Sequence, residues 1–133
     1  MSSATLEIRS NGALNVVQDL GRPGWLSQGI SNAGAMDAGA LRIANAMAGN
    51  EAGCAAIEIS LFPFRAHLLS DATLAWAGAD STAAIDGVAH PPWWSTRVRS
   101  GQTITIAPPR RGARVYLACS GGIGLLPVSL TPT

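Results

Sequence analysis

The hydrophobic pattern of this chain of 133 residues begins with a period of two. Thr5–Arg9 alternates apolar and polar residues, as a half-buried strand does, and Leu14–Gln18 has the composition of a second strand. Asn11-Gly12 lies between them and is a turn signal. Residues 5–18 are therefore predicted to form a β-hairpin.

The period then changes to that of an amphipathic helix, predicted from Met36 to Met47. Its apolar stripe consists of Ala40, Leu41, Ala44, Met47 and Ala48. Asp37 stands at its start, where a carboxylate can cap free N–H groups. Gly49-Asn50 ends the helix, because both residues tolerate the left-handed conformation that follows a last turn.

The remainder of the chain returns to short apolar segments at close spacing, which predict strands. The predicted strands are Ala56–Leu61, Phe64–Leu69, Thr73–Ala77, Thr82–Ile85, Ser95–Val98, Thr103–Ile106 and Arg114–Ala118. Asp86-Gly87 is predicted to be a tight hairpin turn. The fold is thus expected to be mainly β with one α-helix, arranged as a barrel or a sandwich.

Composition narrows the class of protein. Hydrophobic residues make up 47% and charged residues 13%, which disfavours disorder. No apolar run predicts a membrane span, and Met1–Thr5 lacks the features of a signal peptide, so a cytoplasmic protein is expected. All nine basic residues are arginines. Without lysine, the chain cannot carry biotin or lipoate itself, form a lysine Schiff base or supply a P-loop lysine.

The histidines, the cysteines and the arginine pair indicate neither a metal site nor a nucleic-acid site. His67 and His90 lack neighbouring ligands, and Cys54 and Cys119 form no CxxC pair, so no metal is expected and both thiols are interpreted as buried. Arg110-Arg111 is interpreted as a solvated turn, because no further basic or aromatic cluster indicates nucleic-acid binding.

Several motifs occur together in a distinctive order. They are Gln18-Asp19-Leu20-Gly21-Arg22-Pro23-Gly24, Gly34-Ala35-Met36-Asp37, Ala44-Asn45, Gly49-Asn50, Ala56-Ile57-Glu58-Ile59, Trp76-Ala77-Gly78-Ala79-Asp80, Arg114-Val115-Tyr116-Leu117-Ala118 and Gly121-Gly122-Ile123. This series, from Leu6 to Pro127, closely resembles the opening of the allophanate hydrolase subunit 2 family. The resemblance implies a cyclophilin-like β-barrel, the first of two barrels in the family module, over residues 1–127. Residues 128–133 depart from the family pattern and are interpreted as a divergent or truncated tail.

The resemblance also implies a function. The family includes the C subunit of bacterial 5-oxoprolinase, the carboxyltransferase half of urea carboxylase and a sporulation-kinase regulator subunit. A subunit of an ATP-dependent 5-oxoprolinase-type complex, inactive alone, is the expected function. A urea carboxylase carboxyltransferase part and a non-catalytic regulatory subunit are alternatives. No intrinsic cofactor is expected: ATP or carboxy-biotin would act only through partners, namely a subunit-1-type protein and a lactam-utilisation subunit.

Candidate substrate-binding residues lie in the recognised motifs or, for Arg42, on the predicted helix, and all but Met36 are polar. They are Gln18, Asp19, Arg22, Met36, Asp37, Arg42, Asn45 and Glu58. The loop from Gly21 to Gly34 should bring Asp19, Arg22, Asp37 and Arg42 into one polar neighbourhood that can orient an amide or a carboxylate. A structural turn and a salt-bridge cluster are equally compatible with these residues.

Three further placements are open from the sequence. Arg42 and Asn45 share a helix face away from the apolar stripe, which is either solvated or pocket-lining. Glu58 lies opposite Ile57 and Ile59 by alternation, towards solvent, a pocket or a barrel interior. Trp93-Trp94 is expected to place one ring in the core and the other at an interface. The surface around Trp93 or Trp94 and the segment Leu125–Leu130 are expected to mediate self-association or binding of a subunit-1-type partner.

Overall fold

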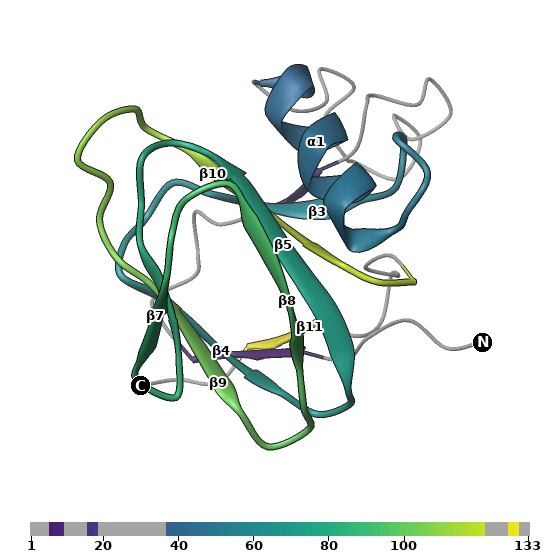
Figure 1. The fold of residues 1–133 in the computed structure, drawn as a ribbon, viewed down its shortest axis with the longest axis vertical. Coiled ribbons are helices and arrows are strands. Elements are labelled where there is room, and N and C mark those ends of the chain that lie inside the picture. The colour runs from purple at the N-terminus through teal and green to yellow at the C-terminus, as the bar shows by residue number, and fades with distance from the viewer. Residues whose placement is uncertain (1–5, 10–15, 19–36, 122–127, 131–133) are drawn as a thin grey trace.

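The computed structural model describes residues 6–9, 16–18, 37–121 and 128–130 (Figure 1). These residues form two β-sheets and one helix, α1 (Ala38–Ala48). One sheet has the order β11 (Val128–Leu130), β1 (Leu6–Ile8), β4 (Phe64–Leu68), β9 (Thr103–Ile106), β6 (Ala83–Ile85), β7 (Val88–His90). The other has the order β2 (Val16–Gln18), β3 (Ala56–Ile59), β10 (Val115–Cys119), β5 (Ala72–Gly78), β8 (Trp94–Val98).

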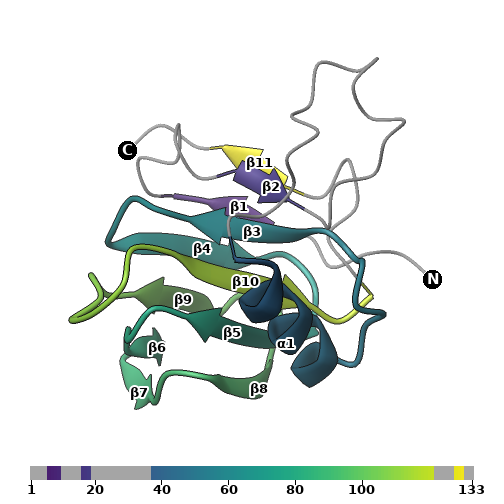
Figure 2. The same ribbon diagram turned by 90° about the horizontal axis from the view of Figure 1, so that it is seen from above.

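The two sheets enclose the main hydrophobic core, and α1 covers the outer face of the five-stranded sheet (Figure 2). Alternation along each strand assigns its side chains to these two layers. In β5, Leu74 and Trp76 point into the core between the sheets, whereas Ala75 and Ala77 face α1. Alanines on this outer face allow the helix to pack closely against β5 and β10.

The ends of α1 follow the sequence prediction. The Asp37 carboxylate Oδ1 accepts a hydrogen bond from the Ala40 N–H at 3.0 Å, and Gly49 has the left-handed φ of 84°. Helix and caps are therefore confirmed, with the first helical residue at Ala38 rather than Met36. No described helix is long and apolar enough to cross a bilayer.

The predicted hairpin over residues 5–18 is wrong. β1 pairs with β4 and β11 in the six-stranded sheet, whereas β2 pairs with β3 in the five-stranded sheet. Each strand thus takes a partner that is distant in sequence, and local alternation carries no information about such a partner. The Asn11-Gly12 turn lies outside the described residues.

The Asp86-Gly87 turn is confirmed, since β6 and β7 pair across it and both residues have positive φ. The sequence did not predict β11, which runs parallel to β1 with Leu6 opposite Val128. Residues 128–130 are therefore part of the six-stranded sheet. Cys119 is buried as expected, while Cys54 is only half-buried, and both are free thiols.

The expectation that one of the two adjacent tryptophans lies in the core is wrong. Trp93 and Trp94 keep 44% and 47% of their surface exposed. Trp93 has a φ of 59°, so it precedes β8 in a left-handed turn rather than continuing the strand. The indole that is buried between the sheets belongs to Trp76.

Candidate functional site

A chain of polar contacts lies between the five-stranded sheet and the start of α1. The Tyr116 hydroxyl donates to Glu58 Oε2 at 2.5 Å and accepts from the Asp37 backbone N–H at 2.9 Å. Tyr116 and Glu58 are cross-strand partners in β10 and β3, which brings their side chains to the same face of the sheet. The hydroxyl therefore connects a buried carboxylate to the N-terminal end of the helix.

Arg114 extends this chain towards the surface. Its guanidinium Nε lies 3.8 Å from Glu58 Oε1, and its side chain is 38% exposed, whereas that of Glu58 is 9% exposed. A buried carboxylate needs hydrogen-bond donors or a cation to offset the loss of water. Tyr116 and Arg114 supply one of each, so Glu58 is held in a fixed position.

Close contact between two backbone segments positions Arg114. The Ala79 N–H donates to the Arg114 carbonyl at 2.8 Å, and the Asp80 N–H donates to the Arg111 carbonyl at 2.8 Å. A Cβ on Gly78 would lie 2.5 Å from the Arg114 carbonyl oxygen, so only glycine permits this approach. The loop before β10 is thereby tied to the end of β5.

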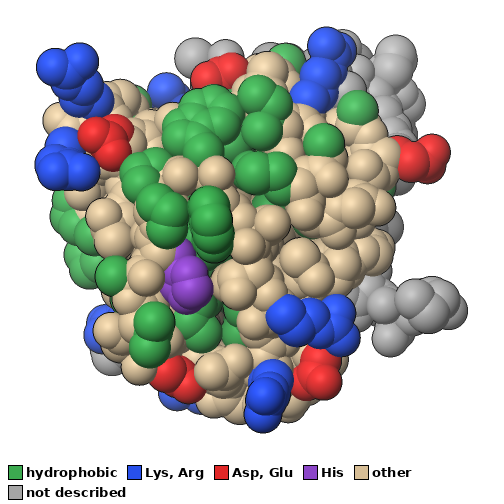
Figure 3. Space-filling view, in the orientation of Figure 1, with side chains coloured by type: hydrophobic (Ala, Val, Ile, Leu, Met, Phe, Trp, Pro, Cys, Tyr) green, Lys and Arg blue, Asp and Glu red, His purple; other side chains and the backbone are tan. Residues whose placement is uncertain are grey.

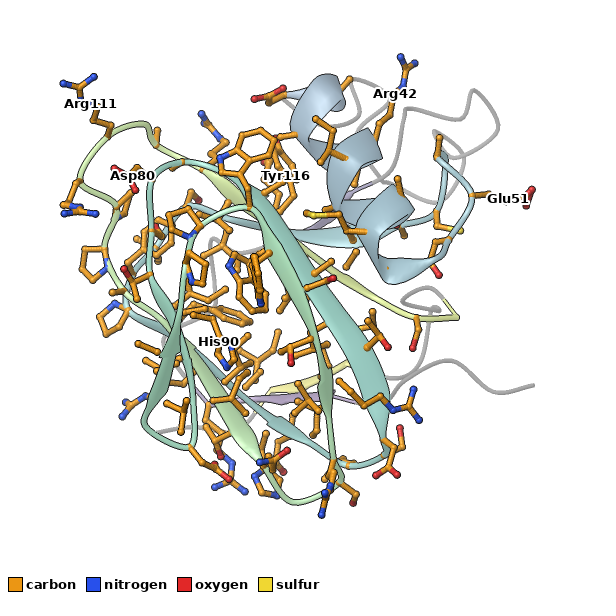
Figure 4. All side chains as sticks on the ribbon, in the orientation of Figure 1. Arg42, Glu51, Asp80, His90, Arg111 and Tyr116 are labelled. Carbon is orange, nitrogen blue, oxygen red and sulfur yellow. The ribbon has the colours of Figure 1, made fainter. Side chains whose placement is uncertain are left out.

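A hollow of about 700 Å³ opens beside these contacts. It is lined by Asp37, Gly78, Ala79, Asp80, Pro92, Trp93, Arg111, Gly112, Ala113 and Arg114. In Figure 4, Tyr116 lies beside α1 and Asp80 lies within the curve of the loop between β9 and β10, while the Arg111 side chain extends outward from that loop. The lining thus combines carboxylates, guanidinium groups and one exposed indole, a set that suits a small polar ligand with a flat face.

Burial and the hydrogen bond to Glu58 raise the pKa of Tyr116 above its ordinary value. The phenol therefore keeps its proton across the neutral range and remains a donor to Glu58. It is a fixed support for the Glu58 carboxylate rather than a base.

The structure brings two of the sequence candidates together, since Asp37 and Glu58 both bind Tyr116. Arg42 is exposed and extends away from Tyr116 on the outer side of α1 (Figure 4). Gln18 belongs to β2, where it pairs with Ala56. Asp19, Arg22 and Met36 lie outside the described residues, so the proposed neighbourhood of Asp19, Arg22, Asp37 and Arg42 stays a prediction.

The placement of Asn45 on a solvated or pocket-lining face is wrong, because it is fully buried. Its amide Nδ2 donates to the carbonyls of Ala52 at 3.3 Å and Cys54 at 2.8 Å, and its Oδ1 accepts from Asn50 at 3.2 Å. A short polar side chain can be buried beside the apolar face of α1 when the adjoining loop offers backbone hydrogen-bond partners. Asn45 thus fixes the connection from α1 to β3.

Sequence reasoning missed four residues of this site, namely Tyr116, Arg114, Asp80 and Trp93. The first three belong to the Trp76–Asp80 and Arg114–Ala118 motifs, which support the resemblance without chemistry being assigned to them. The sequence feature that could have indicated the site is Tyr116, the one tyrosine in an otherwise apolar strand. A buried tyrosine hydroxyl requires a hydrogen-bond partner.

The architecture defines a class of protein: a mainly β domain of two sheets with one covering helix and a polar hollow beside the helix start. Residues 28–130 match the family described as carboxyltransferase domain, subdomain A and B, and the chain belongs to this family. The resemblance deduced from the motifs and the cyclophilin-like barrel are confirmed.

Two curated relatives show the range of the family. The chain is 41% identical to the C subunit of 5-oxoprolinase from Escherichia coli over 92% of this chain and 40% of that protein. It is 36% identical to a putative urea carboxylase of Emericella nidulans over 90% of this chain and 10% of that protein. The chain therefore spans less than half the length of these relatives.

The fold also recurs in a solved structure. The urea carboxylase of Kluyveromyces lactis superposes with a TM-score of 0.80 and 27% identity, covering 92% of this chain and 11% of that one. The two-sheet domain described above is thus one part of a much larger protein in that case.

Proposed function

We propose that the chain is a subunit of a 5-oxoprolinase-type complex, in which its hollow holds the amide of 5-oxo-L-proline while the lactam is opened to L-glutamate. The observation that carries this proposal is the contact chain from Asp37 through Tyr116 and Glu58 to Arg114 at the edge of the hollow. The relationship to the 5-oxoprolinase C subunit supports the choice of substrate.

The chemistry of the lining suits that substrate. A lactam offers one N–H donor and one carbonyl acceptor in a plane, and 5-oxoproline adds a carboxylate. Arg114 can donate to the carbonyl or the carboxylate, and Asp37 or Asp80 can accept from the N–H. Glu58, fixed by Tyr116, keeps the Arg114 side chain at the hollow.

The chain supplies binding and orientation, and its partners supply the rest of the reaction. The sequence has no lysine, so ATP-dependent chemistry falls to a subunit-1-type partner and a lactam-utilisation subunit. Alone, the chain should not turn over 5-oxoproline.

The test is reconstitution of the complex from this chain and both partners of its own organism. We expect ADP and glutamate formation that depends on 5-oxoproline and on this chain. Arg114→Ala should raise KM roughly tenfold or more, since a charge-assisted hydrogen bond is lost. Arg97→Ala, an exposed arginine of β8 outside the hollow, is the matched control and should leave KM unchanged.

Full activity of the two partners without this chain, or of the complex carrying Arg114→Ala, would overturn the proposal. A second candidate is the carboxyltransferase part of a urea carboxylase system, favoured by the superposition with the Kluyveromyces lactis enzyme. Urea-dependent use of carboxy-biotin on a partner, with no response to 5-oxoproline, would select it.

A further inference from the structure

Trp93 lines the hollow with an unusual backbone. Its φ of 59° lies in the left-handed region, which a bulky side chain rarely adopts and which glycine or asparagine would occupy more easily. The residue is 44% exposed, so burial of a large side chain does not offset this conformational strain. Strained backbone of this kind is enriched at binding and active sites, where surrounding contacts hold it.

The segment that carries Trp93 is held firmly on both sides. Before it, the Pro91 carbonyl accepts a hydrogen bond from the Trp76 indole N–H at 2.9 Å. After it, Trp94 pairs with Trp76 across β8 and β5. Trp76 is 1% exposed and also contacts the His90 ring at a centroid distance of 6.2 Å. A buried side chain therefore fixes the turn that presents Trp93.

The indole of Trp93 has an open ring surface within the described part of the chain. There, the one contact between aromatic rings joins Trp76 and His90. In Figure 3, hydrophobic side chains gather on the face that carries β7 and β8. Trp94 is similarly exposed, but only Trp93 of the two lines the hollow, together with Asp37 and Arg114.

We propose that Trp93 is a specificity-determining residue whose indole stacks on the flat face of a planar lactam, while Asp37 and Arg114 bind its polar rim. This inference rests on the proposed function and specifies how the hollow selects its substrate. An aromatic face and a flat amide bury area efficiently at little cost in side-chain entropy. A preorganised indole therefore favours planar rings over puckered ones of equal size.

The test uses the indole N–H signals of the ¹⁵N-labelled chain, which has four tryptophans. Trp93→Phe identifies the Trp93 signal by its disappearance. The probes are 5-oxo-L-proline, pyrrolidinone (a lactam without the carboxylate) and L-proline (the carboxylate without the planar amide). Both lactams should shift the Trp93 signal, and L-proline should not.

Two variants separate the ring from the backbone. Trp93→Gly suits the positive φ and should fold, but it should weaken lactam binding by roughly five- to tenfold, the loss expected for one aromatic stacking contact. Trp93→Phe should retain binding within about twofold, since it keeps an aromatic face. Trp94→Phe is the matched control and should bind as the unmodified chain does.

An unmoved Trp93 signal at saturating lactam, an absence of lactam binding, or full binding by Trp93→Gly would each overturn the stacking role. These outcomes are distinct from failure of the proposed function. If the reconstituted complex needs Arg114 and turns over 5-oxoproline while lactams leave the Trp93 indole signal unmoved, only the stacking role is wrong. If lactams bind at Trp93 but no 5-oxoproline turnover depends on this chain, only the proposed function is wrong.

Discussion

Tyr116 donates its hydroxyl hydrogen to Glu58 at 2.5 Å from a strand 58 residues further along the chain. Both side chains lie on the outer face of the five-stranded sheet, and Tyr116 is fully buried against α1. Because the same hydroxyl accepts from the Asp37 N–H, it fixes the helix start relative to the sheet. The shape of the hollow depends on these contacts of Tyr116. Asp37 lines the hollow at the start of α1, and Arg114 lines it directly before β10.

Removal of the Tyr116 hydroxyl should destabilise the fold. Tyr116→Phe removes one donor from the buried Glu58 carboxylate and the acceptor from the Asp37 N–H, and we expect a loss of about 2–3 kcal/mol in the free energy of unfolding. Urea denaturation followed by tryptophan fluorescence measures it. Ser100→Ala removes an exposed hydroxyl and should cost less than about 0.5 kcal/mol. Equal stability of the two variants would show that the Tyr116 contacts are not important.

Stability should fall at alkaline pH. The folded state raises the pKa of Tyr116 above the ordinary value of 10.0, and burial raises the pKa of the Cys119 thiol from 9.0 to about 12. The unfolded chain therefore releases these protons first, so the stabilisation is complete below pH 9 and declines as the pH rises above 9 and then 10.

Two measurements check this pH dependence. The chain has one tyrosine, so phenolate absorbance reports Tyr116 alone, and it should stay low in the folded protein at pH 10. Tyr116→Phe should lose stability less steeply above that pH. A phenolate signal that rises near pH 10 without unfolding would contradict the burial of the hydroxyl.

Asn45 should act on stability through the loop that follows α1. Asn45→Ala removes three hydrogen bonds, to Ala52, Cys54 and Asn50, which connect the buried helix face to the loop that follows. We expect a loss of about 2–4 kcal/mol in unfolding free energy. Arg42→Ala, on the exposed side of the same helix, is the control and should change it by less than about 0.5 kcal/mol. Thermal unfolding of both variants decides whether Asn45 is structural.

The sequence was informative wherever local chemistry determines structure. The Asp37 cap, the Gly49 end and the alternation of Glu58 against Ile57 and Ile59 each depend on a few consecutive residues. The pairing of Glu58 with Tyr116 could not be predicted from neighbouring residues. The pairing follows from the register between β3 and β10, which non-local packing determines.

Asn45 and Trp93 show two other limits of the sequence. A polar residue on a helix is expected to face water, and only the carbonyls of the following loop make burial of Asn45 favourable. Two adjacent tryptophans are expected to alternate, and only the left-handed turn at Trp93 prevents it. Both departures place a side chain where propensity alone would not, and both depend on tertiary contacts.

The contact between Gly78 and Arg114 offers the sharpest test of how the hollow is built. Gly78 has a φ of 121°, and a Cβ there would meet the Arg114 carbonyl oxygen at 2.5 Å. Gly78→Ala must therefore move the backbone of one segment and lengthen the neighbouring hydrogen bond from Ala79. We expect a loss of roughly 2–5 kcal/mol in unfolding free energy, from overpacking added to the cost of the backbone conformation.

Gly87→Ala separates these two contributions. Gly87 also has a positive φ, of 84°, but no atom lies within 4 Å of the position that a Cβ would occupy, so only the conformational cost of about 1–2 kcal/mol applies. Gly78→Ala should in addition weaken 5-oxoproline binding, because it displaces Arg114, whereas Gly87→Ala should not. Calorimetric titration of both variants measures this difference. Equal stability and equal binding would show that the β5 end and the loop before β10 do not need to approach closely.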